Sequence, residues 1–423
     1  MTEINGPRLL EDLRAFSQIG GRPDGGLDRL AWTEADLEGR RWLADRMRAC
    51  GLDARTDPAL NVFGHLAAST GPWLLLGSHT DSVPRGGRLD GAYGTIAALE
   101  VLRALVEAHD SLAEHVEIVG WADEEGVRFE NGLIGSRALA GELNPDDLEE
   151  QTDWQGEPVA VVLARAGVDL ERINEAHEHL DFLNGYLELH IEQGPRMEAD
   201  GFDLAVVTGI VGVHREKVRT EGVQNHAGTT PFRMRKDAGR AAARAVAGLR
   251  ELVQAVDQEA VANVGAIHFD PGGINVVPGR AEFDLEVRHG NDAVVRGIVH
   301  TFHDRLHQIC AEEGCRADAD FRSYEPAVAM DAGVMAALER ACQSLSSRVT
   351  KLASGAGHDA SVMSRHVPTG MLFVPSIGGI SHAPEENTSD EHLVLGARAL
   401  LCAVREVTAA LSGGRAQAST SGS

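Results

Sequence analysis

The sequence has 423 residues, more than one domain usually holds, and its 43% hydrophobic residues are enough for two sizeable cores. Lys and Arg number 39 against 64 Asp and Glu, which gives a net charge of −25. A surface of this charge repels nucleic acid and anionic membranes, and an anionic small molecule would need a local cationic pocket.

The first half of the chain alternates helices with strands. We expect helices over residues 9–17, 33–51 and 94–109, and strands over 61–66, 73–76, 116–121 and 187–191. Thr33 is placed as the N-cap of the second helix, and Gly51 stops it. The apolar strand at 73–76 ends at Gly77-Ser-His-Thr-Asp, and the strand at 116–121 ends at Asp123-Glu-Glu-Gly. Polar motifs at the carboxyl ends of strands are typical of α/β folds, in which ligands collect there.

The pattern changes after about Ile210. Strand-like segments at 211–221, 262–269, 281–288 and 316–322 are interleaved with helical segments at 235–256 and 291–313. The order strand, helix, strand, strand, helix, strand is that of a small α+β sandwich. We therefore predict a larger α/β domain of residues 1–210 and 327–423, with a central mixed sheet flanked by helices, and an inserted α+β domain at 211–326. The larger domain resumes with a helix over 332–346, a strand over 371–374 and a helix over 390–411, and the low-complexity end from Leu411 is expected to be disordered.

The five cysteines favour a cytoplasmic protein. They form no CxxC pair, and their odd number indicates reduced, structural thiols: Cys50, Cys310, Cys315, Cys342 and Cys402. The N-terminus has no basic segment followed by an apolar core, so we expect no signal peptide. No window approaches 18 uninterrupted apolar residues, so we expect no membrane span.

Five short motifs carry candidate metal ligands. They are Gly77-Ser-His-Thr-Asp-Ser-Val-Pro, Gly87-Arg-Leu-Asp-Gly-Ala-Tyr-Gly, Asp123-Glu-Glu-Gly, Glu188-Leu-His-Ile-Glu-Gln-Gly-Pro and Gly379-Ile-Ser-His-Ala-Pro-Glu-Glu, which contain His79, Asp90, Glu125, His190 and His382. Nitrogen and oxygen ligands without a thiolate suit Zn, Mn, Co or Ni. Two divalent ions about 3.5–4 Å apart can share a bridging carboxylate and activate a bridging water. Glu124, directly beside Glu125, lies where a general base for that water is needed.

Taken singly, such residues are ordinary surface or loop residues, because the chain has 18 His and 64 acidic residues. Longer strings are more specific: Gly77-Ser-His-Thr-Asp-Ser-Val-Pro-Arg-Gly-Gly-Arg-Leu-Asp-Gly, Glu124-Glu-Gly-Val-Arg-Phe, His190-Ile-Glu-Gln-Gly-Pro, Asn225-His-Ala-Gly-Thr-Thr-Pro, Ser354-Gly-Ala-Gly-His-Asp-Ala and Phe373-Val-Pro-Ser-Ile-Gly-Gly-Ile-Ser-His. They resemble the M20-type metallopeptidase superfamily and, within it, the amidase/carbamoylase branch of N-carbamoyl-L-amino-acid hydrolases, allantoate amidohydrolases and β-ureidopropionases. The resemblance extends from about Ala35 to Leu411. His190 indicates the amidase branch, because the peptidases usually carry an acid at this position.

The resemblance implies a site for two divalent ions. Asp90 would bridge them, and His79 with Glu125, or His190 with His382, would complete the ion positions; which terminal ligands share an ion stays open.

The resemblance also implies roles for residues around the ions. Asp81 would hold the second nitrogen of His79, with direct metal ligation as the alternative. Glu124 would act as the general base. The inserted domain would be a lid and the dimerisation surface of a homodimer, and its His226 would stabilise the oxyanion in the partner subunit's site.

Substrate contacts are implied for five further residues. Asn275 and Arg288 would hold a substrate carboxylate, for which the planar guanidinium of Arg288 is well suited. Gln193 and the segment containing Gly357 would contact the ureido group, and His214 is a further candidate.

The activity expected on these grounds is hydrolysis of an N-carbamoyl-L-amino acid to the amino acid, carbon dioxide and ammonia. Allantoate is the close alternative, because the motif around His226 resembles that subgroup, and β-ureidopropionase activity is a third possibility. Val213 stands where allantoate enzymes tend to carry Gln, which leaves His214 to compensate. A dinuclear aminopeptidase or dipeptidase is disfavoured by His190, and a non-enzymatic binding protein by the presence of every proposed ligand and Glu124.

Overall fold

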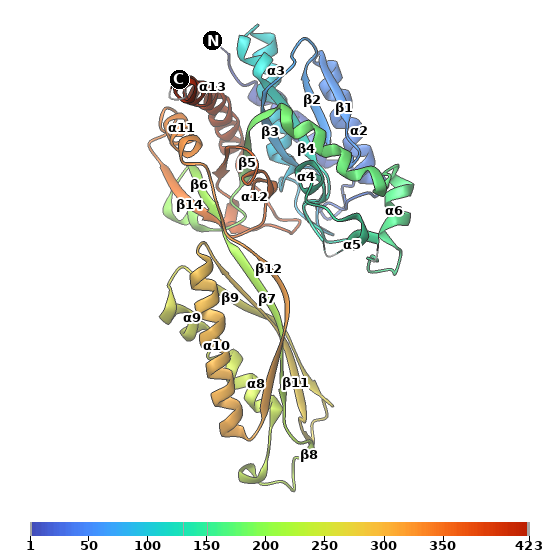
Figure 1. Ribbon diagram of the computed structural model, residues 1–423, viewed down its shortest axis with the longest axis vertical. Helices are drawn as coiled ribbons and strands as arrows, with labels where there is room; N and C mark the ends of the chain where they lie inside the picture. The colour runs from blue at the N-terminus through green and yellow to red at the C-terminus, as the bar shows by residue number, and fades with distance from the viewer. Residues whose placement is uncertain (1, 130, 150, 421–423) are drawn as a thin grey trace. The chain divides into compact units, whose positions relative to one another are not determined.

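The computed structural model describes residues 2–129, 131–149 and 151–420 (Figure 1). The chain divides into two compact units: unit 1 is Met1–Thr208 with Ala329–Ser423, and unit 2 is Gly209–Val328. These boundaries lie within two residues of the domain boundaries expected from the sequence.

Unit 1 is built on a nine-stranded mixed sheet in the order β1-β2-β4-β3-β5-β15-β6-β13, with β14 paired to β6. The strands are β1 (Leu52–Thr56), β2 (Val62–Leu66), β3 (Trp73–His79), β4 (Val116–Trp121), β5 (Leu183–Ile191), β6 (Leu204–Ile210), β13 (Val328–Ala329), β14 (Val349–Ser354) and β15 (Thr369–Val374). The four central strands β4, β3, β5 and β15 run parallel. The predicted α/β class with a central mixed sheet is therefore confirmed.

Helices flank this sheet. They are α1 (Gly6–Ser17), α2 (Glu34–Ala49), α3 (Ala92–Glu107), α4 (Ile134–Ala140), α5 (Pro145–Glu149), α6 (Val159–Ala166), α7 (Arg196–Asp200), α11 (Ala332–Gln343), α12 (Asp359–Met363) and α13 (Asp390–Thr420), with 3-10 segments η1 (Ser111–His115), η2 (Leu170–Phe182) and η4 (Ile377–Gly379). Every residue of α3 from Ala92 to Leu105 is buried, because this helix packs on β3, β4 and β5 and is covered by α1 and α13. Burial on all sides explains its almost wholly apolar sequence.

The predicted start of α2 is confirmed, because the Thr33 hydroxyl accepts the backbone N–H of Asp36 as an N-cap. The expected end of the last helix at Leu411 is wrong. Helix α13 continues to Thr420, since its last residues include Ala, Arg and Gln, which favour helix. Residues 421–423 of the expected disordered end lie outside the described part of the chain.

Unit 2 is a four-stranded antiparallel sheet in the order β12-β7-β11-β9, with helices on one face. Its elements are β7 (Gly212–Glu221), β8 (Asn225–His226), η3 (Phe232–Met234), α8 (Ala238–Ala247), α9 (Leu249–Val256), β9 (Val261–Asp270), β10 (Val276–Val277), β11 (Arg280–His289), α10 (Asp292–Glu313) and β12 (Arg316–Glu325). The single helix expected over 235–256 is wrong. Gly248 separates α8 from α9, and a glycine inside a helix costs about 1 kcal/mol relative to alanine.

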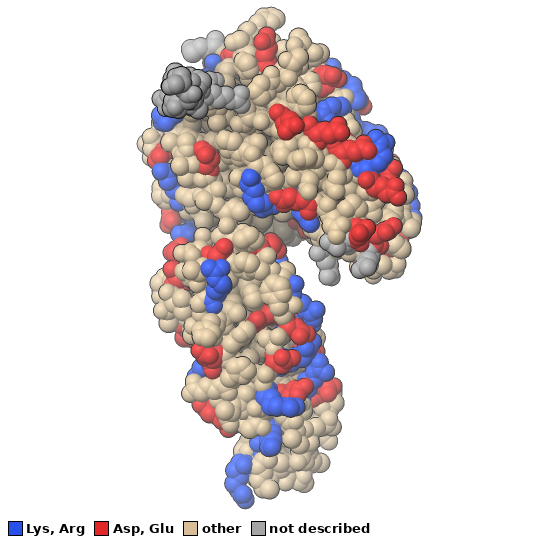
Figure 2. Space-filling view, viewed as in Figure 1, with Lys and Arg blue, Asp and Glu red and all other residues tan. Residues whose placement is uncertain are grey.

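On the face of the unit 2 sheet that the helices do not cover, ion pairs connect neighbouring strands. Strand β7 places Arg215, Lys217 and Arg219 directly opposite Glu286, Asp284 and Glu282 of β11, at N···O distances of 2.8, 3.4 and 2.7 Å. Opposite charges at facing positions stabilise an antiparallel pair. Figure 2 shows basic and acidic side chains interspersed over the face in view, so positive charge there is locally balanced. Among the described residues, none of the helices is both long enough and apolar enough to span a bilayer.

Candidate metal centre and active site

The candidate ligands collect at the carboxyl ends of the central parallel strands of unit 1. His79 is the last residue of β3, and His190 is the residue before the end of β5. Glu125 follows β4, and His382 follows β15. Asp90 lies just before α3, whose N-cap is Gly91. The fold therefore brings together five residues that lie between 79 and 382 in the chain, as expected of ligands at strand ends.

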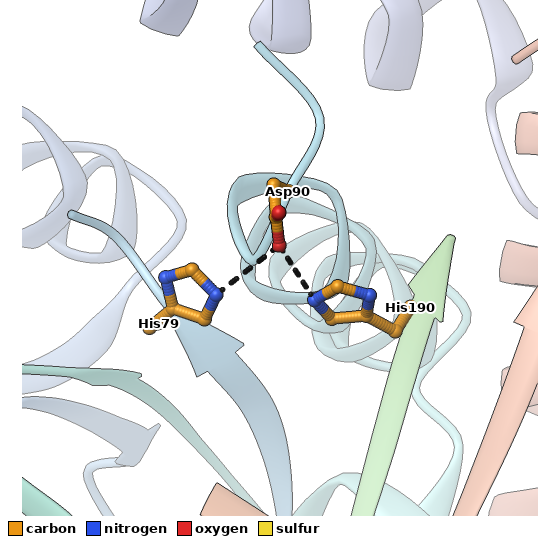
Figure 3. A group of neighbouring side chains, drawn as sticks. All are labelled: His79, Asp90 and His190. Atoms are coloured by element: carbon orange, nitrogen blue, oxygen red, sulfur yellow. Dashed lines mark ion pairs between the residues drawn. The ribbon is translucent and has the colours of Figure 1, made fainter. Parts of the chain in front are cut away.

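Asp90 lies at the centre of this group (Figure 3). Its Oδ1 is 3.4 Å from Nε2 of His79 and 3.1 Å from Nε2 of His190. Gly91 makes room for this arrangement, since an added Cβ there would lie 2.4 Å from the His79 ring, and its φ of +63° is one that glycine adopts freely.

The second oxygen of Asp90 faces a different pair of side chains. Its Oδ2 is 3.1 Å from Nε2 of His382, and that nitrogen is 3.6 Å from Oε2 of Glu125. Two groups of possible ligands result, and within each group the ligand atoms all lie within 4.8 Å of one another. One group is His79, Asp90 and His190, and the other is Asp90, Glu125 and His382. Asp90 is shared by both, which is the geometry of a bridging carboxylate. The sequence left open which terminal ligands share an ion, and these two groups place His79 with His190 and Glu125 with His382.

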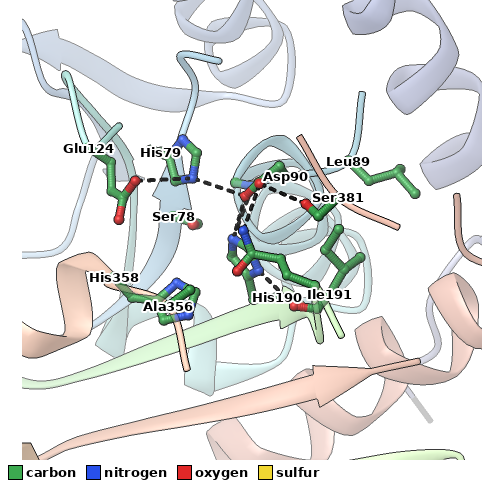
Figure 4. Close-up of polar contacts among 12 residues, drawn as sticks. Ser78, His79, Leu89, Asp90, Glu124, His190, Ile191, Ala356, His358 and Ser381 are labelled. Carbon is green, nitrogen blue, oxygen red and sulfur yellow. Dashed lines mark hydrogen bonds and ion pairs between the residues drawn. The ribbon is translucent and has the colours of Figure 1, made fainter. Parts of the chain in front are cut away.

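Glu124 lies beside this cluster, with its Oε2 3.8 Å from Nε2 of His79 (Figure 4). The carboxylate of Asp81 accepts the backbone N–H groups of Glu124 and Glu125, at 3.2 and 3.3 Å. Oδ1 of Asp81 is also 3.5 Å from Nδ1 of His79, which in addition contacts the Asp81 carbonyl at 3.1 Å. Asp81 therefore orients both an imidazole and the loop that carries the two glutamates.

Crowding of buried acids dominates the electrostatics of the cluster. Burial, together with the negative charge of Asp90, raises the pKa of Glu125 to about 8. Burial also raises the pKa of Glu124 well above its ordinary value, with Glu125 adding to the effect. For Asp90, burial acts to raise the pKa, but the imidazoles of His190, His382 and His79 outweigh it and hold it well below its ordinary value. Such a concentration of buried carboxyl groups calls for positive charge among them.

The residues present fit divalent cations. Oε1 of Glu125, Oδ2 of Asp123 and Oε1 of Gln193 are buried and have no hydrogen-bond partner. Unpaired buried oxygens are unusual in proteins, and a cation would satisfy them. Three imidazoles and two carboxylates form a donor set that suits Zn, Mn, Co or Ni.

Three residues flanking the cluster have left-handed backbones. Asp123, Gln193 and His382 have φ values of +52°, +56° and +55°. Non-glycine residues rarely adopt this conformation, and where they do the strain is often associated with a functional site. Here it occurs on three separate loops, two of which contact Asp90 through Gln193 and His382.

A third group of possible ligand atoms contains Glu188, His190 and His358. Both oxygens of Glu188 already accept hydrogen bonds, from Ser78 at 2.7 Å and from the backbone of Ala360 at 3.0 Å. Nε2 of His358 is 2.8 Å from the Ser354 hydroxyl, and its ring packs edge-on against His190. This group therefore supports His190 and does not form a further ion position.

Of the expected substrate contacts in unit 1, Gln193 lies in the cluster. Its side-chain amide donates to Oδ2 of Asp90 at 2.7 Å, so it contacts the central carboxylate of the cluster. Gly357 lies in the exposed loop before α12, next to His358.

Unit 2 places the other predicted residues in two separate regions. His226 and Asn275 are neighbours: β8 pairs with β10, and the backbone of Ala227 donates to the Asn275 carbonyl at 2.8 Å. Arg288 lies at the opposite end of the sheet, directly across from Val213.

The expectation that His214 contacts substrate beside Val213 does not agree with the structure. Side chains alternate along a strand, so His214 is on the helix-covered face, opposite to Val213 and Arg288. Its imidazole lies 3.1 Å from the buried carboxylate of Glu216, which also pairs with His303 at 2.7 Å.

Ser381 lines the cluster but was not among the expected site residues, whereas His358 belongs to the segment around Gly357 that was expected to contact the ureido group. The Ser381 hydroxyl is 3.1 Å from Oδ2 of Asp90, and His358 packs against His190. Both lie inside motifs already recognised, Gly379-Ile-Ser-His and Ser354-Gly-Ala-Gly-His, so proximity to a ligand was an available signal.

Comparisons with known proteins show the family of the chain. The model of peptidase family M20/M25/M40 matches residues 75–406. The chain is 37% identical to N-carbamoyl-L-amino acid amidohydrolase of Geobacillus stearothermophilus over 401 residues, 94% of this chain and 97% of that protein. It is 35% identical to allantoate amidohydrolase of Bacillus subtilis (strain 168) over 388 residues, 91% and 93% of the two chains. An amidase of the hydantoinase/carbamoylase family from Burkholderia phymatum has a solved structure with a TM-score of 0.86, 36% identity, and coverage of 97% of this chain and 99% of that one.

Proposed function

The chain belongs to peptidase family M20/M25/M40, in its hydantoinase/carbamoylase branch, and we propose that it hydrolyses the carbamoyl C–N bond of N-carbamoyl-L-amino acids. The products would be the free amino acid, carbon dioxide and ammonia. The observation that carries this proposal is Asp90, whose two oxygens face two sets of ligands while Glu124 lies beside them.

Two divalent ions are proposed as the cofactors. His79 and His190 would hold one, Glu125 and His382 the other, and Asp90 would bridge both. Bound there, the ions would polarise the substrate carbonyl and acidify the attacking water. Zn, Mn, Co and Ni all suit these donors.

Glu124 is proposed as the proton carrier of the reaction. Its carboxylate would accept a proton from the attacking water and deliver it to the departing nitrogen. The backbone N–H groups of Glu124 and Glu125 both donate to Asp81, and these hydrogen bonds support the role because they keep the loop in one orientation. A base that is held in place needs no rearrangement when the proton is transferred.

His226 is proposed as the donor to the substrate's developing oxyanion. Its Nδ1 accepts the backbone N–H groups of Gly228 and Thr229, at 3.0 and 3.3 Å. The neutral ring must then carry its proton on Nε2, which leaves an N–H to donate from an exposed side chain.

The substrate carboxylate is proposed to bind to Arg288 and Asn275, and their separation supports a shared site. Arg288 is eight residues along β11 from Arg280, which lies at the His226 end of the sheet, and at about 3.4 Å per residue this is about 27 Å. A small substrate cannot reach both ends of one unit 2. Contact with both requires a second copy of the chain, and we therefore propose a homodimer whose unit 2 is a lid that completes the partner's site.

Exposed apolar surface near His226 also supports a second copy. Phe232 and Ile274 are 75% and 104% exposed in the single chain. Strand β9 is at the edge of its sheet, so it is open to pairing with another chain.

Hydrolysis of N-carbamoyl-L-amino acids is favoured over allantoate hydrolysis because Val213, directly across from Arg288, offers no polar contact to a second ureido arm. His214 cannot compensate, since it lies on the other face. Allantoate nevertheless remains the second candidate, because the allantoate amidohydrolase of Bacillus subtilis (strain 168) is almost as similar to this chain. Dipeptide hydrolysis is disfavoured by His190. The five unpaired cysteines support a cytoplasmic location.

The test is ammonia release by full-length protein loaded with Mn, Co or Zn. The panel contains N-carbamoyl-L- and D-amino acids, N-carbamoyl-β-alanine, allantoate and simple dipeptides, the last followed by amine release. We expect turnover of the L-carbamoyl compounds with a clear preference over the D forms. Preference for allantoate or N-carbamoyl-β-alanine would replace the proposed substrate, and cleavage of dipeptides alone would replace the proposed reaction.

A further inference from the structure

Glu386 is a buried carboxylate that connects the two loops carrying Asp90 and His382. It is 2% exposed, although it follows the surface residue Glu385. Its Oε1 accepts the backbone N–H groups of Leu89 and Asp90, at 2.9 and 3.0 Å. Asp90 is 296 residues away along the chain, so this contact joins two distant segments beside the candidate metal centre.

The other oxygen of Glu386 serves the loop that carries His382. Oε2 accepts the Ser381 hydroxyl at 2.6 Å and lies 3.3 Å from the backbone N–H of His382. One carboxylate thus faces four donors, two from each loop. An ionised carboxylate accepts about four hydrogen bonds, so these four donors use all of its acceptor positions. A glutamine could accept at only one of the two positions, and its NH₂ group would face donors at the other.

The fold leaves a space that fits this carboxylate. A Cβ added at Gly87 would lie 2.0 Å from Cδ of Glu386 and 2.1 Å from its Oε1, so any side chain at residue 87 would displace the carboxylate. Gly87 opens the same motif that contains Asp90. The sequence of this loop is therefore compatible with Glu386 as well as with Asp90.

We propose that Glu386 is a positioning residue that sets the separation of Asp90 and His382 and so forms the ion position that these two share with Glu125. This inference rests on the proposed two-metal centre. Within the described part of the chain, Glu386 makes no hydrogen bond or ion pair to the side chain of an expected ligand. It acts through the backbone of Asp90 and His382 and through Ser381, whose hydroxyl also lies 3.1 Å from Oδ2 of Asp90. His79 and His190, on β3 and β5, do not depend on it.

The inference predicts an asymmetric defect. Loss of a residue that orients metal ligands typically weakens metal binding 10- to 100-fold. In Glu386→Gln, the ion position formed by Glu125 and His382 should be affected most, because Glu386 anchors the backbone of both Asp90 and His382 there. The position formed by His79 and His190 should be weakened less, because it shares only Asp90 with the anchored loops. Gly87→Ala should reproduce this defect, since it displaces the same carboxylate without changing its chemistry.

The experiment titrates Co²⁺ into the metal-free full-length protein and follows visible absorption and bound cobalt. Wild type, Glu386→Gln, Gly87→Ala and the exposed neighbour Glu385→Gln as control are compared, together with thermal unfolding of each metal-free protein. We expect two ions in wild type and control, and in both test variants one ion weakened about 10- to 100-fold and the other weakened clearly less.

Three results would overturn the inference. Glu386→Gln could bind both ions as wild type does, with the same spectrum. It could lose both ions equally and unfold at a clearly lower temperature, which would make Glu386 a general stabiliser of the fold. Wild type could itself bind fewer than two ions; that outcome removes the two-metal proposal, and Glu386 with it, whereas the first two leave the proposed function intact.

Discussion

Mixing two inactive variants tests whether active sites are shared between two copies of the chain. Glu124→Gln removes the proposed base in unit 1, and His226→Ala removes the proposed oxyanion donor in unit 2. If His226 served the site of its own chain, every site in a mixture would still lack one of the two groups. If it serves the partner, a mixed dimer contains one site with both Glu124 and His226 intact and one site with neither.

The expected recovery follows from the symmetry of a dimer. Random exchange at equal concentrations makes about half of the dimers mixed, and one of the two sites in each is intact. Activity should therefore rise to about a quarter of the wild-type value. The separation of about 27 Å between the Arg288 and His226 ends of unit 2 is the reason to expect this result.

The assay is ammonia release from the best N-carbamoyl-L-amino acid, before and after dissociation and reassociation of the mixture. The control pairs Glu124→Gln with Glu125→Gln, because two defects in the same unit leave no intact site in any dimer. Differently tagged chains verify the exchange. Absence of recovery despite verified exchange would refute the shared site and place His226 in its own chain's centre.

Three further predictions concern single residues. Glu124→Gln should bind metal as wild type does but lose about 10²- to 10⁴-fold in kcat, checked by metal analysis beside steady-state kinetics. Arg288→Ala should lower kcat/KM about 10- to 100-fold, mainly through KM, whereas Arg219→Ala on the same face should not; an unchanged KM would place the carboxylate elsewhere. Burial acts to raise the pKa of Glu216, but two imidazoles outweigh it and lower the pKa from 4.5 to about 2. Because a lowered carboxyl pKa stabilises the fold above pH 4.5 and this contribution is lost as pH falls towards 2, Glu216→Gln should reduce the pH dependence of urea unfolding across that window.

The location of the ligands at strand ends could be predicted because a recognisable strand pattern precedes them in the sequence. His79 ends an apolar strand, and the glutamates follow another, so neighbouring strands of a parallel sheet had to bring them together. The division of the ligands between the two oxygens of Asp90 could not be predicted. It depends on how the start of α3 lies between β3 and β5, which is a matter of tertiary packing.

The sheet face of His214 could have been predicted. Residues alternate between faces along the strand expected over 211–221, so Glu216, Val218 and Thr220 share one face. That period places His214 with them and away from Val213. Glu386 is the opposite case, since no local pattern indicates a contact with the backbone of Asp90, 296 residues earlier.

Selection of substrate is expected to depend on unit 2, because the proposed metal chemistry needs only unit 1. Relatives that are 37% and 35% identical to this chain bear the names of different substrates, so overall similarity does not distinguish them. Val213 is the position to change. It lies directly across from Arg288, and facing residues on a strand pair have Cβ atoms about 4.5–5.5 Å apart.

Val213→Gln should therefore place an amide beside the group that holds the substrate carboxylate. A new hydrogen bond to the second ureido arm of allantoate, worth about 1 kcal/mol, corresponds to about a fivefold gain in kcat/KM for allantoate relative to an N-carbamoyl-L-amino acid. His214→Gln is the matched control, because it introduces the same amide on the other face and should leave the ratio unchanged. A ratio that responds to His214 and not to Val213 would mean that substrate is bound elsewhere on unit 2, and the preference for N-carbamoyl-L-amino acids would lose its structural reason.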